Sequence, residues 1–515
     1  MPRALLSVYD KTGLVELAKA LYDMGWELVA SGKTEIALQE AGIPVTALNK
    51  VTGLPEMLGG RVKTLHPAIH AGILARDRAD DMEELNRHGY APINLVVSNL
   101  YPFQQTIAQP GIALQDAIEQ IDIGGVTLLR ASAKNFLRVV PLCDPADYDR
   151  VIEILKKTGE VDLALRRQLA VKAFGHTRDY DTAIHAYLAG DTMPDPSMTD
   201  DITLPDHLSL NVHAVESLRY GENPHQSASY YSRQTQTAPL GGKQFGGKQL
   251  SYNNILDLDA AWRAVSSYSN PTVVIVKHLN PCGVARGKSI TAAYPFALES
   301  DPVSAYGGVI AVNRTVDESF VAALGSLFVE AIAAPDFNAA ALSTLLEKRQ
   351  NCRLLQLSQP FDGSSLEIRS VMNGLLIQRY DMGDPEGTSL RVVTERPPTP
   401  DELDAMRFAW NTVQHVKSNA IVLTQLNYTV GVGGGLSSRV DSVELAVKKA
   451  GDRARGAVLA SDAFFPFPDG IEAAARAGIT AVIQPGGSIR DAQIIEAANK
   501  AGLSMIFTGV RHFRH

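Results

Sequence analysis

Short apolar runs alternate with amphipathic stretches from the first residues of the chain. Ala4–Val8, Glu27–Ala30 and Leu95–Ser98 have the length and character of buried strands, whereas the apolar spacing over Thr12–Met24 and Lys33–Ala41 predicts helices. Strands and helices that alternate across short connections form parallel sheets covered by helices. The first part of the chain is therefore predicted to be an α/β domain that binds ligands at the carboxyl ends of its strands.

A polar, proline-rich stretch interrupts this pattern. Gly190–His207 contains three prolines and five aspartates and almost no periodic apolar residues, which is typical of a linker. We therefore expect a first domain at 1–195, a linker at 196–208 and a second domain at 209–515.

The second domain is also predicted to be α/β. Its strand-like runs are Thr272–Val276, Val309–Val312, Ala420–Leu423 and Thr480–Ile483. A weakly patterned stretch at Gln359–Ser365 is followed by three closely spaced prolines, Pro397, Pro398 and Pro400. This joint predicts two subdomains, although the sequence contains no short-period repeat.

The composition narrows the class of protein. The 515 residues are 45% hydrophobic and 20% charged with a formal net charge of −8, which excludes a disordered chain and argues against a general nucleic-acid binder. The three cysteines lie far apart in sequence, so neither a disulfide framework nor a structural zinc site is expected. We recognise no signal peptide and no apolar run of membrane-spanning length, and expect a cytoplasmic protein.

The loop VASGKT contains a phosphate-binding signal of limited specificity. It is not a P-loop, because Glu27 stands where a Walker A motif needs its first glycine. Ser31, Gly32 and Thr34 nevertheless lie between a strand and a helix, where backbone N–H groups and hydroxyls can hold one phosphate. An ordinary capped turn would have the same sequence.

Two further motifs of the first domain carry charge. Arg61, Lys63 and Thr64 follow a double glycine and suit a polyanion, although a solvated basic loop has the same composition. Asp122 precedes another double glycine, and Lys134 follows twelve residues later. These two groups can form a simple ion pair or an acid–base pair with shifted pKa values, and their spacing leaves both interpretations open.

The motif KHLNPCG is the main chemical signal of the second domain. Lys277 and His278 follow a predicted strand directly, where a general base and a cation can act together. A zinc deaminase is excluded, because Asn280 and Ala285 replace the glutamate and the second cysteine of that signature. The glycines of GVGGGLSSR suggest a phosphate loop, but Leu436 breaks the dinucleotide-binding pattern.

Taken in order, the motifs cover nearly the whole chain and resemble one family, the bifunctional AICAR transformylase/IMP cyclohydrolases of purine biosynthesis. The matching motifs are SVYDKTGL, VASGKT, GGRVKTLHPAIHAGIL, NLYPF, IDIGGVTLLRASAKN, SLRYGENPHQ, QLSYNNILDLDAAW, KHLNPCG, SDPVSAYGG, APDF, KSNAIVL, SDAFFPFPDG and the terminal RHFRH.

The resemblance implies an enzyme with two activities and two folds. A cytidine-deaminase-like second domain with two subdomains would transfer a formyl group from 10-formyl-tetrahydrofolate to AICAR, giving FAICAR. A methylglyoxal-synthase-like first domain would close FAICAR to IMP with loss of water. The family implies a homodimer with transformylase sites at the subunit interface and no metal in the chemistry, and leaves a monovalent cation open. It implies no nucleic-acid or membrane partner.

The resemblance also implies roles for individual residues of the transformylase. His278 would be the base, Lys277 would stabilise the oxyanion or assist proton transfer, and Asn419 would hold the formyl oxygen or the substrate. The residues expected to bind AICAR or its phosphate are Arg219, Tyr220, Arg439, Arg511 and His515, and Asp336 is expected to contact the folate.

Ring closure is assigned to the first domain in the same way. Lys63 and Tyr101 would stabilise charge on oxygen, and Asp122 with Lys134 would transfer protons. The residues expected to hold the phosphate and ribose are Ser7, Lys11, Ser31, Gly32, Thr34, Arg61 and Thr64.

Two positions depart from the family pattern, and three other classes of function compete with it. Lys33 replaces a glycine, and Leu436 replaces a polar glutamine. The competing classes are an enzyme with one decayed domain, a nucleotide sensor without catalysis, and a methylglyoxal-synthase-like lyase. The last would leave the remaining three hundred or so residues without a role.

Overall fold

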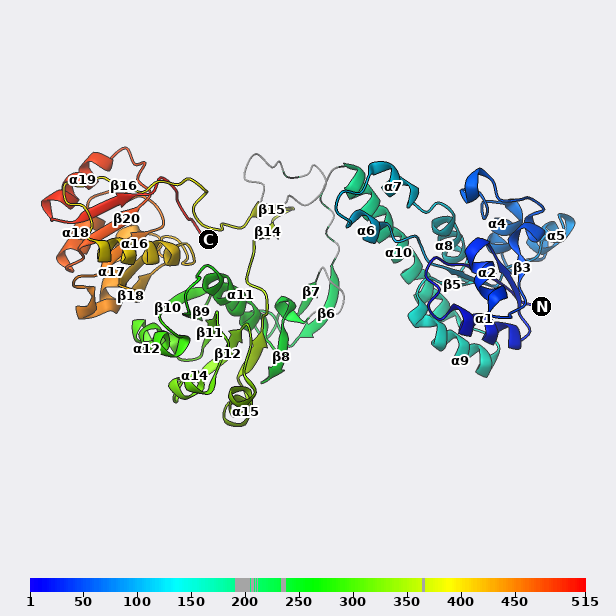
Figure 1. The fold of residues 1–515 in the computed structure, drawn as a ribbon, viewed down its shortest axis with the longest axis horizontal. Coiled ribbons are helices and arrows are strands. Elements are labelled where there is room, and N and C mark those ends of the chain that lie inside the picture. Colours follow the sequence, from blue (N-terminus) through cyan, green and yellow to red (C-terminus); the bar gives the residue numbers. More distant parts are fainter. Residues whose placement is uncertain (190–203, 205–207, 209, 211, 233–237, 364–365) are drawn as a thin grey trace. The chain divides into compact units, whose positions relative to one another are not determined.

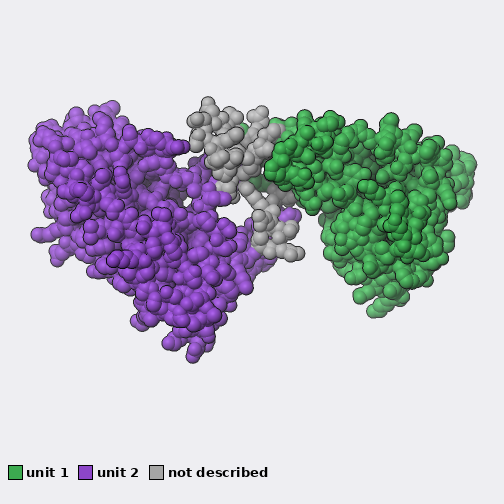
Figure 2. All heavy atoms as spheres, in the orientation of Figure 1, with its two compact units in different colours: residues 1–211 green, residues 212–515 purple. Residues whose placement is uncertain are grey.

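The computed structural model describes residues 1–189, 204, 208, 210, 212–232, 238–363 and 366–515 (Figure 1). The chain divides into two compact units, residues 1–211 and 212–515, which are coloured separately in Figure 2. The linker predicted at 196–208 lies outside the described residues except for Leu204 and Leu208. No helix in the described part of the chain is long and apolar enough to cross a membrane.

The first unit is built on the parallel sheet that the sequence predicts. Its five strands have the order β3-β2-β1-β4-β5, and every neighbouring pair is parallel. The strands are β1 (Arg3–Ser7), β2 (Glu27–Ala30), β3 (Thr46–Ala47), β4 (Leu95–Ser98) and β5 (Val140–Leu142). The predicted strands and helices at the start of the chain are confirmed.

Helices cover both faces of this sheet. One face packs on α1 (Leu14–Asp23), α2 (Gly32–Glu40) and α9 (Tyr148–Thr158), and the other on α3 (Leu48–Thr52), α4 (Pro67–Leu74) and α8 (Gly124–Lys134). The other helices are α5 (Ala79–Arg87), α6 (Phe103–Ile107), α7 (Leu114–Glu119) and α10 (Leu163–Ala189). Helix α10 packs along α8 and α6, so it supports the elements that carry Asp122 and Tyr101.

The second unit contains a twelve-stranded mixed sheet with the order β16-β21-β20-β19-β17-β18-β10-β9-β11-β12-β13-β8. Its first half contains β8 (Lys243–Gly246), β9 (Thr272–Lys277), β10 (Asn280–Arg286), β11 (Gly308–Val312), β12 (Val329–Ala334) and β13 (Arg353–Gln356). Its second half contains β16 (Arg391–Val392), β17 (Ile421–Gln425), β18 (Tyr428–Gly433), β19 (Val458–Ser461), β20 (Ala481–Gln484) and β21 (Ser504–Phe507).

The two halves repeat one plan. Each consists of a helix, a β-hairpin, a second helix and three parallel strands joined by helices. The corresponding helices are α11 (Tyr252–Ser266) and α16 (Pro400–Val413), α12 (Ile290–Ser300) and α17 (Arg439–Ala450), α14 (Glu318–Ala323) and α18 (Asp469–Arg476), and α15 (Ala339–Lys348) and α19 (Asp491–Lys500). The predicted proline joint opens the second half, because Pro400 is the first residue of α16 and follows the N-cap Thr399, whose capping box with Glu402 spans it.

Helices on both faces make this unit a three-layer structure. Helices α11 and α16 pack on one face, and the helices that follow each hairpin pack on the other. The short helix α13 (Pro302–Ala305) and two separate hairpins, β6 (His213–Leu218) with β7 (Ala228–Ser232) and β14 (Leu366–Val371) with β15 (Gly374–Arg379), complete the described α-helices and strands.

Glycines inside the central strands let the helices approach closely. A Cβ at Gly283 of β10 would lie 1.9 Å from the carbonyl oxygen of Ala297 in α12. At the corresponding place in the second half, a Cβ at Gly431 of β18 would lie 2.1 Å from the carbonyl oxygen of Ala446 in α17. The glycines that suggest a phosphate loop in GVGGG thus begin inside a strand, where they serve packing.

We predict that Gly283→Ala and Gly431→Ala each destabilise the second unit by roughly 2–3 kcal/mol, because a methyl group has no room against helix backbone. The matched control is Gly175→Ala on α10, where nothing lies within 4 Å of the added methyl. That change should raise the stability of the first unit by roughly 0.5–1 kcal/mol. Urea unfolding followed by circular dichroism measures all three, and an unchanged midpoint for both strand variants would contradict the packing argument.

Candidate active sites

The carboxyl ends of β1 and β4 meet where the strand order of the first sheet reverses, which is where α/β sheets bind ligands. Asn99, directly after β4, joins the two loops there. Its Oδ1 accepts the backbone N–H groups of Tyr9 at 2.6 Å and Asp10 at 3.0 Å. The loops predicted to bind ligand are therefore held together by one amide side chain.

Three lysines gather at the N-terminus of α2. A Cβ at Gly32 would lie 3.4 Å from Nζ of Lys63, so the motifs VASGKT and GGRVKT are in contact. Burial lowers the pKa of the Lys11 ammonium, and the positive charges of Lys33 and Lys63 lower it further. Cations that repel one another at the positive end of a helix are stabilised by a bound anion. The departure Lys33 thus adds a charge to this group.

Hydroxyl groups complete this cationic loop cluster. The Thr34 Oγ1 donates to the Val8 carbonyl at 3.0 Å and accepts its N–H at 3.1 Å, and Ser7 and Ser31 place their Oγ atoms 3.5 Å apart. The Thr64 Oγ1 is buried and has no hydrogen-bond partner among the described residues. Its hydrogen-bonding capacity is therefore unused within the described residues.

Asp122 and Tyr101 have perturbed proton affinities beside these lysines. Burial raises the pKa of Asp122, although hydrogen bonds from the Gly125 and Tyr101 backbones and the charge of Lys63 oppose the shift. Burial and the negative charge of Asp122 raise the pKa of Tyr101. A buried carboxyl group whose pKa is raised toward neutrality can exchange protons with a substrate.

Two predicted residues of the first unit, Lys134 and Arg61, are exposed. Helix α8 has 11 residues, so it separates Asp122 before its first turn from Lys134 at its last by about 16 Å. Lys134 is exposed, and the structure does not bring this pair together within one chain. Arg61 is exposed and forms an ion pair with Glu119.

In the second unit, Lys277 and His278 stand at the end of β9, as the sequence predicts. The Lys277 Nζ donates to the carbonyls of Tyr306 and Gly307, each at 2.9 Å. An ammonium group has three donors, so one remains for a ligand. His278 is exposed at the tip of the β9–β10 hairpin. Cys282, on the zinc-like motif, packs in the core, and burial raises the pKa of its thiol to about 12.

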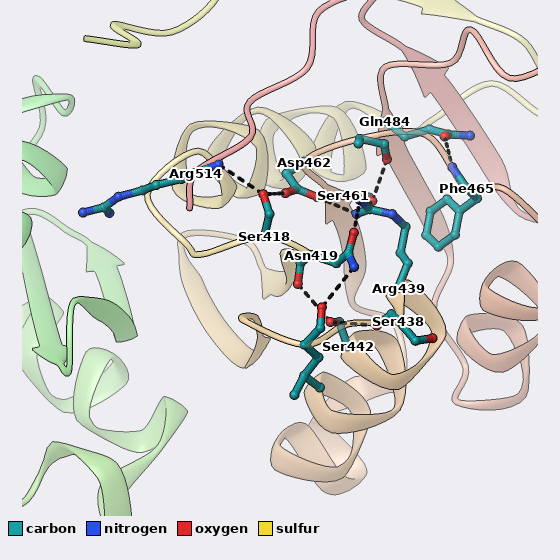
Figure 3. Close-up of polar contacts among 12 residues, drawn as sticks. Ser418, Asn419, Ser438, Arg439, Ser442, Ser461, Asp462, Phe465, Gln484 and Arg514 are labelled. Carbon is teal, nitrogen blue, oxygen red and sulfur yellow. Dashed lines mark hydrogen bonds and ion pairs between the residues drawn. The ribbon is translucent and has the colours of Figure 1, made fainter. Parts of the chain in front are cut away.

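Asn419 lies in a polar network just before β17 (Figure 3). Its Oδ1 accepts from the Arg439 guanidinium at 2.7 Å, and its Nδ2 donates to the carbonyls of Leu436 at 3.0 Å and Ser437 at 3.2 Å. Leu436 therefore contributes a backbone carbonyl, which its apolar side chain does not alter.

Arg439 is buried within the same network. Its guanidinium also forms an ion pair with Asp462, which is fully buried, and donates to the Ser461 Oγ at 2.8 Å. Together with the bond to Asn419, these contacts make Arg439 a support for that amide. Sequence reasoning missed Asp462, although it lies in the motif SDAFFPFPDG.

Strand register places these groups at the same end of the central strands. The start of β17 and the end of β18 pair at Ile421 and Gly433, and the backbone N–H of Lys417 donates to the Asn280 Oδ1 at 2.9 Å. The hairpin with His278 and the loop with Asn419 thus adjoin. Asp336 follows the far end of β12, because β9 runs antiparallel to β11 while β12 runs parallel to it. The structure therefore puts Asp336, the predicted folate contact, at the opposite end of the strands from Lys277.

The C-terminus lines a pocket of about 480 Å³. Arg511 and His515 are on its wall together with Arg263, Arg369 and Tyr380. These predicted binding residues are therefore built into the fold, and the charged tail is not frayed. Arg219 and Tyr220 follow β6, where the guanidinium lies 5.6 Å from the phenol ring, and neither lines this pocket.

His512 anchors that tail and carries no predicted role. The side chain is 2% exposed, and its Nδ1 and Nε2 lie 2.7 Å from Asp381 and 3.1 Å from Asp384. Burial of the ring lowers its pKa, but the hydrogen bonds and charges of both carboxylates outweigh burial and raise the pKa of His512 to about 9. Its neighbours in the tail, Arg511 and Phe513, are exposed.

The free energy of unfolding should therefore fall at alkaline pH, because His512 loses its proton there. The His512 ion pairs stabilise the fold fully below the ordinary pKa of about 6.5, and this contribution is lost as pH rises through about 9. We predict that His512→Gln costs up to roughly 3 kcal/mol of unfolding free energy at pH 6 and much less at pH 9.5. Urea unfolding of both proteins across that range checks this, and a difference that does not change with pH would refute the charged state.

Comparison with known proteins adds family evidence to this geometry. Residues 132–449 match a family described as AICARFT/IMPCHase bienzyme, and residues 13–127 match an MGS-like domain. Proteins named "Bifunctional purine biosynthesis protein PurH" are 49% identical over 518 residues in Desulfitobacterium hafniense (strain DSM 10664 / DCB-2) and 50% identical over 519 residues in Cyanothece sp. (strain PCC 7425 / ATCC 29141). Both alignments cover 100% of this chain and at least 99% of the relative.

Proposed function

The chain belongs to the AICARFT/IMPCHase bienzyme family, and on that premise we propose how its two units divide the chemistry. The protein is a bifunctional purine-biosynthesis enzyme, an AICAR transformylase and IMP cyclohydrolase that performs the last two steps of IMP synthesis. We propose that the second unit transfers the formyl group and the first unit, with its MGS-like domain, closes the ring.

The formyl transfer needs a base and a stabiliser of negative charge. The AICAR amine is a weak nucleophile, so His278 takes its proton as the nitrogen attacks the formyl carbon. The remaining N–H of Lys277 faces the oxygen that gains charge, and the Asn419 amide holds that oxygen or the substrate. The bond from the formyl carbon to the folate nitrogen then breaks, and that nitrogen receives a proton.

Substrate binding is assigned to residues from several elements of the second unit. A folate formyl donor follows from the transformylase activity, and we propose that it is 10-formyl-tetrahydrofolate, with Asp336 as a contact. Arg511 and His515, in the pocket wall, with Arg219 and Tyr220, are proposed to bind AICAR. Arg439 would act on the substrate through Asn419.

A second copy of the chain would complete the transformylase site. Asp336 is remote from Lys277 within one chain, which supports a homodimer with sites at the subunit interface. The hairpin β14–β15 supports the same proposal, because Met372 is 91% exposed and Leu376 is 60% exposed. Large apolar side chains on one exposed hairpin are typical of an interface. A cytoplasmic location remains a prediction.

Ring closure is proposed to depend mainly on position and charge. The carboxamide nitrogen of FAICAR attacks its own formyl carbon, and alignment of the two groups can contribute roughly 7–11 kcal/mol. The phosphate binds in the cationic loop cluster through Ser7, Lys11, Ser31, Gly32, Thr34 and Thr64, with Arg61 as a further cation. Lys63 and Tyr101 stabilise charge on oxygen, and Asp122 transfers protons before water leaves.

The observation that carries the two-site assignment is the separate clustering of these groups on two sheets. We predict that Lys277→Ala and His278→Ala each lower formyl transfer by ~10²-fold or more and leave the cyclisation of supplied FAICAR intact. Parallel assays of tetrahydrofolate and IMP measure both reactions. Loss of both activities in a folded variant would show that the assignment is wrong.

The first unit gives the reverse prediction. Asp122→Asn should lower cyclisation by ~10²-fold and let FAICAR accumulate, because the amide cannot exchange the proton. Lys134→Ala is the comparison, since the resemblance assigns it to the same proton transfer. The length of α8 leads us to expect a smaller loss for Lys134→Ala, and an equal loss would mean that another copy of the chain supplies this lysine.

One assay of the wild-type protein separates the competing classes of function. AICAR and 10-formyl-tetrahydrofolate are supplied, and tetrahydrofolate and IMP are followed together. Equal amounts of both support two working sites, and tetrahydrofolate with FAICAR alone indicates a decayed first unit. Nucleotide binding without either product would identify a sensor.

A further inference from the structure

The turn that presents His278 has a backbone conformation that its residues disfavour. Lys277 and Asn280 pair across the β9–β10 hairpin, which leaves His278 and Leu279 as a two-residue turn. Both have positive φ angles, +53° and +68°. Turns of this kind usually contain Asn-Gly, because a side chain at positive φ crowds its own carbonyl. Something outside the turn must hold His-Leu in this shape.

One carboxylate from another element bonds to the turn itself. The Oδ1 of Asp257 accepts the backbone N–H of Leu279 at 2.7 Å. Asp257 is half-buried in α11, which begins at a capping box formed by Ser251 and Asn254 and packs on the sheet beneath the hairpin. Asp257 lies in the motif QLSYNNILDLDAAW, to which no chemical role has been given.

The two residues that flank the turn are anchored separately. Lys277 is held by two carbonyls just before β11, and Asn280 is held by the backbone N–H of Lys417. The Leu279 side chain packs against the core under α11. The imidazole of His278 is exposed and hydrogen-bonds to none of the described residues. With no hydrogen bond between the ring and the described residues, the backbone of the turn sets the direction in which the side chain leaves the hairpin.

We propose that Asp257 is a positioning residue for formyl transfer, which fixes the left-handed turn at His278–Leu279 and so aims the His278 imidazole at the substrate amine. This inference rests on the proposed role of His278 as the base. The carboxylate acts as a hydrogen-bond acceptor on the backbone, and it takes no proton from the substrate.

A second interpretation is that Asp257 acts by its charge on the imidazole. Burial raises the pKa of Asp257, while hydrogen bonds from the Leu279 and His278 backbones and the positive charges of His278 and Lys277 lower it. The two interpretations differ for an amide at this position. An asparagine keeps the acceptor oxygen and removes the charge, whereas an alanine removes both.

The test compares Asp257→Ala and Asp257→Asn in the full-length enzyme. We expect Asp257→Ala to lower kcat for formyl transfer by about 10–100-fold with KM for AICAR changed less than about threefold, because a misplaced group loses rate rather than affinity. Asp257→Asn should retain kcat within about threefold of wild type. Its pH profile should match that of wild type, and cyclisation of supplied FAICAR should be unchanged in both variants.

The matched control is Asp317→Ala. The Asp317 carboxylate accepts the Phe320 N–H at 2.9 Å at the start of α14, so this variant loses the same kind of bond in the same unit without touching the turn. We expect it to lose similar thermal stability and to keep formyl transfer. A loss of transfer equal to that of Asp257→Ala would reduce Asp257 to a structural role.

The remaining outcomes are also decisive. Full transfer activity in folded Asp257→Ala would overturn the proposal, and so would an Asp257→Asn enzyme as impaired as Asp257→Ala. A shifted pH profile in Asp257→Asn would show that Asp257 acts by its charge and not by positioning the turn. His278→Ala, measured beside them, tests the premise: if it retains transfer, the role of His278 fails whatever Asp257 does.

Discussion

The contact between β10 and β18 makes one sheet out of the two halves of the second unit. Ala285 and Tyr428 are paired there, and the Thr429 Oγ1 accepts the Val284 N–H at 2.9 Å and bonds to the Ser300 Oγ at 2.9 Å. This threonine is fully buried, so an unpaired strand edge at this seam would leave polar groups without water. Because the seam is closed, the loops after β9 and before β17 adjoin and can act on one substrate.

The cations of the two units have different partners. In the first, Lys33 and Lys63 lower the pKa of Lys11 at a helix N-terminus, although the charge of Asp10 opposes the shift, and a bound anion would stabilise these cations. In the second, the cations Arg439 and His512 are buried on carboxylates of the protein. The first arrangement keeps charge available for a ligand. The second uses charge to hold an amide and the C-terminal tail in fixed positions.

Local patterns predicted the fold well and the grouping of residues less well. Strands such as Thr272–Val276 are fully buried, so an apolar run identifies them directly. Lys277 and His278 could be placed because a strand end is a local feature. The remote position of Asp336 follows from an antiparallel pairing, and the separation of Asp122 from Lys134 from a helix whose whole length lies between them. Asp257 and Asp462 have their partners far along the chain, and no local spacing reveals those bonds.

The duplicated plan gives the second sheet an approximate two-fold axis through the β10–β18 seam. Because β10 and β18 are antiparallel, this axis exchanges the two ends of the strands. The counterpart of the His278 turn is the β17–β18 turn, where Leu426 also has a positive φ, +51°. At that turn the Arg286 guanidinium binds the Asn427 Oδ1 at 2.6 Å and an oxygen of Asp404, so these polar groups are paired within the protein. Symmetry thus supplied two equivalent sheet ends. At one end the polar groups are paired with each other, and at the other the His278 side chain is exposed and stays available for the proposed formyl transfer.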